Sequence, residues 1–322
     1  MRELLIGKND AGQRIDKFLT KALPALPTVL LYKFIRIKKI KCNGARTEQG
    51  YILQEGDVIT LYIKDEFFEP KARDDAFTIL TPRIDIVYED ENIIVCDKRP
   101  GIVVHSDESE KTNTLISHIK AYLYRKGEYC PEAEQSFAPA LCNRIDRNTG
   151  GMVIAAKNAE ALREMNEAIK NDRITKKYLC AVHGILRKKE GTLTGYLVKD
   201  SATNRVKVYD ELPRSCAAKN IVTKYRVISE KGDLSLVDAT LVTGRTHQIR
   251  AHFAHIGHPL LGDGKYGVNA LDRKKGYKFQ ALYSYDLTFH ITTGALSYLD
   301  GKHLSVDKNK IWFLSEFEDA DK

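Results

Sequence analysis

Strand-like and helix-like segments follow one another in an irregular order through most of this 322-residue chain. Short apolar or alternating runs predict strands at 83–88, 93–98, 152–156, 175–184 and 234–242. Apolar spacing and capping residues predict helices at 114–127, 158–171 and 246–257. A doubly wound parallel sheet needs regular strand–helix–strand alternation, which this order lacks. The sequence therefore predicts an α+β fold with a mixed, largely antiparallel sheet.

The first 65 residues predict a small separate module. A helical apolar stripe is formed by Ile15, Phe18, Leu19 and Leu23, and Pro27 can open a second helix over 28–39. Asn43-Gly44 is the signal of a tight hairpin turn. Residues 66–82 show no periodicity and hold two prolines, so we interpret them as a linker. Residues 83–322 then form the second predicted domain.

The charge of the chain favours a polyanionic partner. The net charge is +8 and the sequence pI is about 9.0. Six cations follow one another in the module without an intervening acid: Lys33, Arg36, Lys38, Lys39, Lys41 and Arg46. Such a run is often only a solvated face, but here a helix end and a strand would gather it on one side. The layout resembles the alpha-L RNA-binding module of ribosomal small-subunit protein S4, so we interpret the run as an RNA contact.

Composition indicates the class of protein and the compartment that we expect for it. Hydrophobic content of 43% and charged content of 29% are typical of a soluble globular protein. No apolar run approaches the ~20 residues of a membrane helix, and the first residues lack the apolar core of a signal peptide. The six cysteines are scattered without a C-x-x-C pair, so neither zinc nor a disulfide framework is indicated. We expect a cytoplasmic protein without membrane contact, and a monomer.

One carboxylate stands out in the stretch RIDRNTGG. Asp146 lies between Arg144 and Arg147, shortly before the predicted strand at 152–156. Burial favours the neutral form of an acid, whereas a guanidinium at ~4 Å attracts the carboxylate by about 4 kcal/mol at an effective dielectric of ~20. A structural salt bridge or an Asx turn explains the pattern, and so does a catalytic acid that must stay ionised in a closed site.

Three stretches decide between these alternatives: RIDRNTGG, KKYLCAVHG and TGRTHQIRAHFAHIGHPLLGDGKYG. Their order and separation, from about residue 84 to about residue 290, resemble the pseudouridine synthases of the RluA type, the branch that includes RluC and RluD. Two departures are small. Asn143 stands where a histidine commonly precedes the arginine, which affects how a flipped base is held. Lys98-Arg99-Pro100-Gly101 replaces a more usual K-P-x-G.

The resemblance implies isomerisation of uridine in RNA to pseudouridine, without cofactor or metal. It implies that Asp146 is the essential acid, that Arg250 pairs with it, and that Tyr178 packs against the uracil. A flipped base needs such an aromatic wall to replace its former stacking. Arg144, Arg245 and His247 are then expected to contact RNA. Relatives with an N-terminal RNA-binding module usually act on large-subunit ribosomal RNA, which is the expected partner.

Two alternatives remain open from the residues. The histidines of THQIRAHFAHIGH (His247, His252, His255 and His258) suggest a metal-dependent hydrolase, although their spacing fits no recognised ligand pattern. The helix at 246–257 also needs Ile249, Phe253 and Ile256 inward, which scatters the histidines around it. The free N–H groups from Thr243 to Thr246 at its start suit an anion. The other alternative is an RNA-binding protein that keeps this scaffold without turnover.

Overall fold

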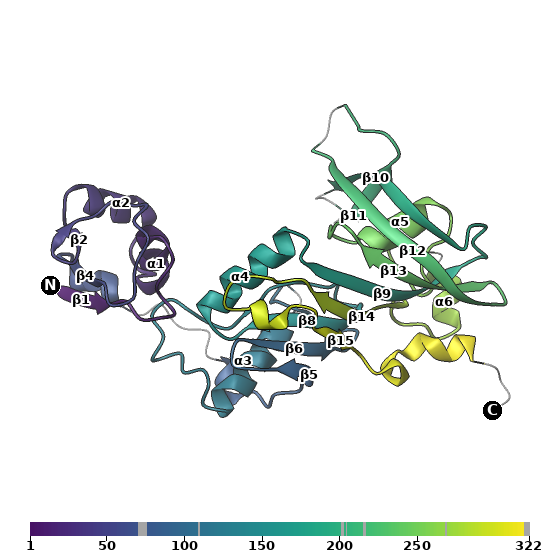
Figure 1. Cartoon of the computed structure of the whole chain (residues 1–322), viewed down its shortest axis with the longest axis horizontal. Coiled ribbons are helices and arrows are strands. Elements are labelled where there is room, and N and C mark those ends of the chain that lie inside the picture. The colour runs from purple at the N-terminus through teal and green to yellow at the C-terminus, as the bar shows by residue number, and fades with distance from the viewer. Residues whose placement is uncertain are drawn as a thin grey trace.

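The computed structural model describes residues 1–69, 76–108, 110–200, 203, 205–214, 217–267 and 269–318. Its N-terminal part is a compact module at one end of the molecule (Figure 1). Helices α1 (Ile15–Ala22) and α2 (Thr28–Arg36) share a core with a four-stranded sheet. The strands in their spatial order are β1 (Arg2–Leu5), β4 (Val58–Leu61), β2 (Ile40–Cys42) and β3 (Ala45–Arg46).

Local sequence signals explain this module well. The four residues of the predicted apolar stripe are all buried, and α2 follows directly on Pro27. Asn43 and Gly44 have φ values of 51° and 74°, and Cys42 pairs with Ala45. Two successive positive φ values match the twist of a tight hairpin, which is why Asn-Gly is favoured there. The hairpin register places Lys41 directly opposite Arg46.

The remaining strands form one large sheet. The main order is β11–β10–β12–β13–β9–β14–β8–β6–β5, with β15 paired to β14 and β7 to β8. The strands are β5 (Asp85–Glu89), β6 (Ile93–Lys98), β7 (Ala140–Leu141), β8 (Gly150–Ala156), β9 (Ile174–His183), β10 (Glu190–Asp200), β11 (Arg205–Tyr209), β12 (Lys219–Lys231), β13 (Leu234–Leu241), β14 (Leu282–Phe289) and β15 (His303–Ser305). Among the described strands only β8 and β14 run parallel, so the largely antiparallel α+β fold is confirmed.

Helices cover both faces of this sheet and divide its core in two. Helix α3 (Leu115–Arg125) and helix α5 (Gln248–His255) bury side chains on the face that carries Ile94 and Cys96 of β6. Helix α4 (Ala159–Lys170) packs on the opposite face, with Ile93 and Val95. The predicted N-caps of α3 and α4 are present, since Thr114 and Asn158 each accept a hydrogen bond from a backbone N–H in the first turn.

Short helices complete the chain. Helix α6 (Asn269–Lys274) precedes β14, and 3-10 turns span Asp65–Phe68, Ala76–Ile79, Ser297–Leu299, Lys308–Lys310 and Trp312–Phe317. The last two form the C-terminal segment, which passes below α6 in Figure 1. Within the described ranges no helix is long and apolar enough to cross a membrane.

Polar contacts join the module to the large sheet domain. Ser136 Oγ donates to Asp10 Oδ1 at 2.6 Å, and Gln135 Nε2 contacts the Leu5 carbonyl at 2.6 Å. Arg163 of α4 reaches the carbonyl of Ala11 at 3.0 Å. Among the described residues these contacts come from the β1–α1 region of the module, at the side that faces the large sheet domain (Figure 1).

Two details differ from the sequence-based expectations. Helix α5 ends at His255, so Ile256 lies at its C-cap and is 39% exposed rather than inward. In the segment interpreted as a linker, residues 70–75 lie outside the described residues, and Phe77 is buried with its ring 5.8 Å from that of Tyr129. That part of the segment belongs to the core below α3.

Candidate active site

The loop between β7 and β8 carries Asp146. A turn and a buried side chain shape this loop: the Thr149 N–H donates to the Asp146 carbonyl at 3.0 Å, and the neighbouring Ile145 is buried. Asn143 Oδ1 accepts from the Ile154 N–H at 2.7 Å, so this residue fastens the loop to β8. The side chain of Asp146 is 25% exposed, which leaves it reachable from solvent at the end of a buried strand.

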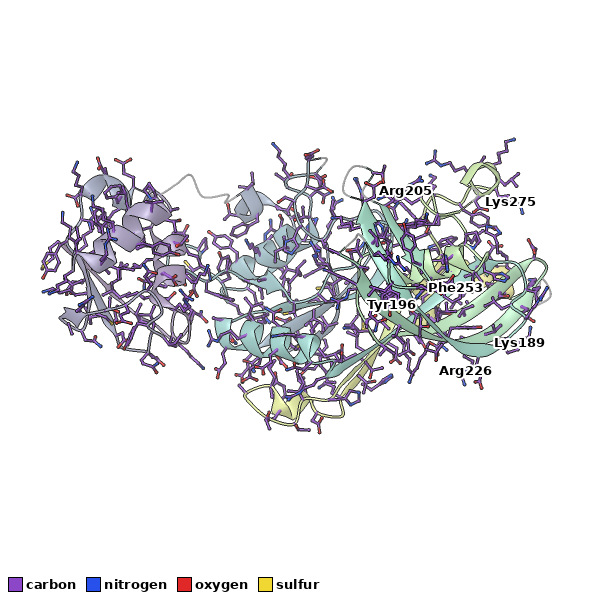
Figure 2. The ribbon with its side chains drawn as sticks, turned by 90° about the horizontal axis from the view of Figure 1, so that it is seen from above. Lys189, Tyr196, Arg205, Arg226, Phe253 and Lys275 are labelled. Atoms are coloured by element: carbon purple, nitrogen blue, oxygen red, sulfur yellow. The ribbon has the colours of Figure 1, made fainter. Side chains whose placement is uncertain are left out.

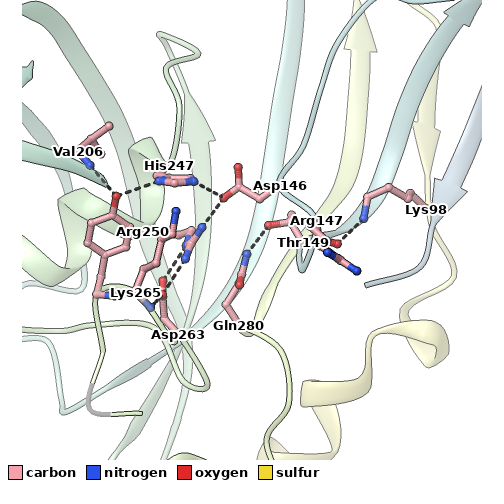
Figure 3. Close-up of polar contacts among 11 residues, drawn as sticks. Lys98, Asp146, Arg147, Thr149, Val206, His247, Arg250, Asp263, Lys265 and Gln280 are labelled. Carbon is pink, nitrogen blue, oxygen red and sulfur yellow. Dashed lines mark hydrogen bonds and ion pairs between the residues drawn. The ribbon is translucent and has the colours of Figure 1, made fainter. Parts of the chain in front are cut away.

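Arg250 of helix α5 forms an ion pair with Asp146. Arg250 Nη1 donates to Asp146 Oδ2 at 2.6 Å, so the expected pair is present although 104 positions separate the two residues. The same guanidinium binds Asp263 through Nε at 2.7 Å and Nη2 at 2.8 Å (Figure 3). One arginine therefore bridges a fully buried carboxylate and a half-buried one.

Electrostatics keep this cluster charged. Burial opposes the charge on Arg250, but Asp263 and Asp146 outweigh it and raise its pKa. Burial likewise disfavours the Asp263 carboxylate, yet Arg250 and the N–H groups of Lys265 and Tyr266 lower its pKa. Both contacts of Asp146 with neighbouring side chains involve Oδ2. Within the described residues, Oδ1 has no hydrogen bond, and it is the oxygen that can meet a substrate.

A histidine and a tyrosine flank the acid. His247 Nε2 lies 3.8 Å from Asp146 Oδ2, and its Nδ1 lies 2.9 Å from the hydroxyl of Tyr266. Burial lowers the pKa of His247, which favours the neutral imidazole at pH 7. Tyr266 accepts from the Val206 N–H at 2.9 Å, and its ring lies 5.2 Å from the Arg250 guanidinium carbon. Tyr266 was not predicted from the sequence, because only its tertiary contacts distinguish it.

Tyr178 lies in the middle of the sheet. It pairs with Ala239 on one side and Ser284 on the other, and it is 6% exposed. As expected, it shares a buried face with Cys180 and Val182. Burial raises the pKa of the Tyr178 hydroxyl to about 12, with a further contribution from Asp146. The hydroxyl is therefore protonated at neutral pH and can donate a hydrogen bond, but it is not a ready phenolate base.

Two residues to which the sequence analysis gave no role in the site anchor the loop. Lys98 Nζ donates to the carbonyls of Arg99, Ile102 and Arg147 at 3.1, 2.9 and 2.9 Å, and the residue is 1% exposed. Gln280 Nε2 donates to Thr149 Oγ1 at 3.0 Å (Figure 3). The contacts with the Arg147 carbonyl and the Thr149 hydroxyl hold the loop within three residues of Asp146, and the other two Lys98 contacts tie it to residues 99–102. The Lys98 signal was visible in the K-R-P-G stretch, whereas Gln280 carried none.

The predicted RNA contacts near the site fall into two groups. His247 joins the Asp146 cluster, while Arg144 and Arg245 are exposed at its border. The expected anion site at the start of α5 is wrong in one respect. The N–H of Arg245 donates to Gln248 Oε1 at 3.0 Å and that of Thr243 to the Val222 carbonyl, so neither is free. A phosphate there would meet the exposed Arg245 side chain and the N–H groups of Gly244 and Thr246, which have no hydrogen-bond partner among the described residues.

The six cations of the module lie apart from this cluster. Lys33, Arg36, Lys38, Lys39 and Arg46 are exposed, and Lys41 is half-buried. Arg36 and Arg46 line one surface hollow together with Arg14, which the sequence had not singled out. Lys41 and Arg46 oppose each other across a strand pair, an arrangement that costs stability unless an anion offsets it.

The four histidines that suggested a metal site contact separate partners. His247 contacts Tyr266, His252 Nδ1 lies 2.9 Å from Thr223 Oγ1, His255 pairs with Asp210, and His258 contacts the His183 carbonyl. In the part of the chain that the structure describes, no group of three or more histidine, cysteine, aspartate or glutamate side chains is arranged to hold a metal ion.

Comparison with known proteins agrees with this geometry. A family described as RNA pseudouridylate synthase matches residues 92–255, and the S4 domain family matches residues 13–59. The chain belongs to the RluA-type RNA pseudouridine synthases, with an S4 RNA-binding domain at its N-terminal side.

Curated relatives extend over most of the chain. An uncharacterised RNA pseudouridine synthase of Mycoplasma genitalium is 33% identical over 97% of each chain. A ribosomal large subunit pseudouridine synthase C of Vibrio vulnificus is 31% identical, covering 83% of this chain and 80% of the relative. Among solved structures, human RNA Pseudouridylate Synthase Domain Containing 1 has a TM-score of 0.53 at 22% identity, covering 77% of this chain and 97% of that one. The last match supports the fold alone.

Proposed function

We propose that this pseudouridine synthase isomerises specific uridines of large-subunit ribosomal RNA, with Asp146 as the essential acid. Family membership makes the protein an isomerase that acts on RNA. The name of the Vibrio relative supports the large ribosomal subunit as the source of the substrate. We assign RNA binding to residues 1–65 and catalysis to residues 83–322, with 66–82 between them, in a cytoplasmic monomer that needs no cofactor.

One observation carries the assignment of Asp146. Its Oδ2 is held by Arg250 at 2.6 Å, while Oδ1 has no hydrogen bond among the described residues. The Arg250 guanidinium places a positive charge beside the carboxylate that nucleophilic attack or proton abstraction would use, and it leaves one oxygen for the substrate. A purely structural ion pair would bury both oxygens, as Asp263 does on the other side of the same arginine.

The reaction needs no group from outside the chain. The bond from ribose C1′ to uracil N1 breaks, the base rotates, and a bond from C1′ to C5 forms. The proton on C5 leaves and N1 ends with a proton, so atoms and charge balance. In our proposal Asp146 acts on the detaching nucleoside, and the Tyr178 ring supports the base during rotation. The Tyr178 hydroxyl, with a pKa of about 12, donates a hydrogen bond within the site.

Contacts with the rest of the RNA are assigned to exposed cations. Arg144 and Arg245 border the Asp146 cluster, and His247 lies within it. The six cations of the module and Arg14 would bind phosphates of a neighbouring helix, because phosphate contacts position an RNA without reading its sequence. The opposed pair Lys41–Arg46 supports this assignment, since an anion removes its repulsion.

The test compares wild type with Asp146→Asn on RNA tritiated at uridine C5. Replacement of the carboxylate by an amide should abolish tritium release, because the amide carries no charge and is a poor nucleophile, while RNA affinity stays within a few-fold. Asp300→Asn, at an exposed aspartate, is the matched control.

Transcripts of large-subunit RNA and a pool of transfer RNA are offered in parallel. Release from ribosomal RNA alone supports the proposed substrate, and release from transfer RNA alone contradicts it. Binding of RNA by the wild type without any release would favour the alternative of an inactive RNA-binding protein. Turnover by Asp146→Asn above a few per cent of the wild type would overturn the role of Asp146.

A further inference from the structure

A second cavity lies away from Asp146, beside the C-terminal segment. Its volume is about 800 Å³, within the usual range of small-molecule sites. It is lined by residues from four parts of the chain: the start of β5, the end of β6 with the residues after it, the stretch from Lys275 to Tyr283 of β14, and the turns at 308–317. The residues that matter here are Asp97, Lys278, Tyr277, Tyr283, Lys310 and Trp312.

The large sheet separates this cavity from the Asp146 cluster. Asp97 and Lys98 are neighbours on β6, so their side chains point to opposite faces. Lys98 holds the loop of Asp146, which places Asp97 on the other face. The same alternation on β14 puts Tyr283 opposite to Ser284, the partner of Tyr178. Lys275, which also lines the cavity, lies at the end of the molecule far from the N-terminal module (Figure 2).

Aromatic rings form one wall of the cavity. The rings of Tyr277 and Trp312 lie 5.9 Å apart with an interplanar angle of 37°, and Phe279 also lines the space. Trp312 Nε1 is buried without a hydrogen-bond partner among the described residues. A buried donor without a partner costs free energy, so an acceptor on a ligand would improve this wall.

Polar groups form the rest of the lining. Lys275, Lys278 and Lys310 are exposed, and within the described ranges none of them forms an ion pair. Asp97 is 4% exposed, and its Oδ1 accepts from the buried Tyr283 hydroxyl at 2.7 Å. Burial raises the pKa of Asp97, and donors from a ligand would stabilise its carboxylate. Asp85 and Glu316 also line the cavity, but Asp97 is the buried carboxylate that a tyrosine hydroxyl fixes in place. The cavity thus joins stacking surfaces, three lysines without ion pairs among the described residues, and carboxylate acceptors.

We propose that this cavity binds a nucleoside phosphate, with guanine as the favoured base. The rings of Tyr277 and Trp312 take the base, Asp97 accepts from its N–H groups, and the lysines contact the phosphate. Guanine presents two adjacent donors, N1–H and the N2 amino group, and a carboxylate can accept both while it keeps the Tyr283 bond. Uracil offers only one donor at its N3 edge, between two carbonyl oxygens that the carboxylate would repel.

The same chemistry fits a free nucleotide or a guanosine within an RNA chain. The two sources differ in what else must fit, because a chain has to enter and leave the cavity through its open side. The site is independent of uridine isomerisation, since the sheet separates it from Asp146. Its failure and the failure of the proposed function are therefore distinguishable.

The test uses Trp312, the single tryptophan of the 322 residues, as its own reporter. Full-length protein is titrated with GMP, UMP and ribose 5-phosphate while tryptophan fluorescence is followed, with N-acetyltryptophanamide titrated in parallel. We expect a saturable change with GMP, about tenfold weaker binding of UMP, and no response to ribose 5-phosphate. A guanosine-containing RNA trinucleotide, tested in the Asp146→Asn background, distinguishes the two sources by whether it binds more tightly or more weakly than GMP.

Variants connect the signal to the cavity. Lys310→Ala and Lys278→Ala should each weaken GMP binding about fivefold because the phosphate is left with one cation fewer, whereas Lys308→Ala, an exposed lysine outside the lining, should not. Asp97→Asn should remove the preference for GMP over UMP. Absence of a saturable response to both GMP and the trinucleotide overturns the proposal. So does a response that Lys310→Ala and Lys278→Ala leave unchanged, or equal binding of UMP.

Discussion

Arg250 and Asp263 form a buried ion pair with two parallel hydrogen bonds, at 2.7 Å from Nε and 2.8 Å from Nη2. The two side chains are 6% and 0% exposed. Because the planar fork is held on one edge, its remaining nitrogen Nη1 is aimed at Asp146 with little rotational freedom. Asp263 is therefore a positioning residue, which acts on the candidate catalytic acid through the arginine.

The first prediction replaces Asp263 by asparagine. The amide keeps the shape but loses the charge, so Arg250 should shift and the single-turnover rate should fall about 10- to 100-fold at unchanged RNA affinity. Breaking a buried pair typically costs about 3–5 kcal/mol of unfolding free energy. Chemical denaturation measures that decrease, and full activity with unchanged stability would contradict the positioning role.

The pH dependence of stability gives this variant a second readout. The pKa of Asp263 is lowered in the folded protein, so its contribution is present at neutral pH and is lost as the pH falls below about 5. Unfolding free energies of the wild type should decline over that interval more steeply than those of Asp263→Asn. Parallel curves would mean that the carboxylate is not stabilised by the fold.

A second prediction concerns Arg250 itself. Arg250→Ala removes the countercharge of Asp146 and leaves Asp263 buried without its guanidinium. Activity should fall by more than about 100-fold, and the acid limb of any residual activity should move to higher pH. Arg250→Lys should restore little of the activity, because an ammonium cannot bind Asp263 through two nitrogens and Asp146 through a third. A pH–rate profile that keeps its wild-type shape and height would show that the arginine serves packing alone.

Tyr178 allows the ring and the hydroxyl to be tested separately. Tyr178→Phe keeps the ring in the core and should retain RNA affinity, while removal of the hydrogen-bond donor slows single turnover by about 100-fold or more. Tyr178→Leu removes the wall as well and should also weaken binding of the RNA. Equal rates for wild type and Tyr178→Phe would assign the residue to stacking only.

Burial and hydrogen bonding act in opposite directions on the charge of the Lys98 side chain. Burial lowers its pKa to about 7, and Asp146 counters part of that shift. Three carbonyl oxygens surround Nζ, and only the charged form has three N–H donors for them, so the geometry favours the ammonium at neutral pH.

Lys98→Met should therefore remove three hydrogen bonds and leave the Ile102 carbonyl without a partner among the described residues, because the carbonyls of Arg99 and Arg147 keep the N–H groups of Ile102 and Gly101. It should lower the melting temperature and reduce the rate measured well below that temperature. Lys126→Met is the control, because the Lys126 side chain is 43% exposed and solvent screens its ion pairs with Glu89 and Glu128. If both substitutions changed the melting temperature and the rate equally, Lys98 would not stabilise the Asp146 loop in particular.

The main parts of the candidate site were predictable because each lies in a compact stretch of sequence. Asp146, Tyr178 and Arg250 were found in three motifs, and the structure brings Asp146 and Arg250 into contact. Asp263 stood inside the third stretch without a stated role. Tyr266 and Gln280 were missed, because a tyrosine or glutamine near a glycine-rich turn has no local mark of what it contacts across the fold.

The fold also has features that local sequence predicts and features that depend on distant contacts. Hairpins, caps and buried stripes follow from local rules, and Thr114, Asn158 and Asn43-Gly44 behave as predicted. The exposure of Ile256 was not predicted, because the expected helix runs to residue 257 whereas α5 ends two residues earlier, at His255. The order of strands in the large sheet, with β14 inserted between β9 and β8, also depends on contacts over more than 100 positions.

The last prediction concerns the cations of the N-terminal module. Lys41 and Arg46 face each other, and Arg36 shares a surface hollow with Arg46, so all three are placed to contact neighbouring phosphates. The double variant Lys41→Gln, Arg46→Gln should weaken binding of structured RNA. It should also reduce the salt slope of log affinity by about 0.7–0.9 for each phosphate that the variant no longer neutralises. The single-turnover rate at saturating RNA should not change, because the Asp146 cluster lies in the other domain.

Removal of the like-charged pair should also stabilise the free protein slightly, since opposed like charges cost about 0.2–1 kcal/mol. The control is Lys170→Gln, an exposed lysine at the end of α4 that should leave the salt slope unchanged. An unchanged slope in the double variant together with a lower saturated rate would mean that the module completes the active site instead of holding the RNA.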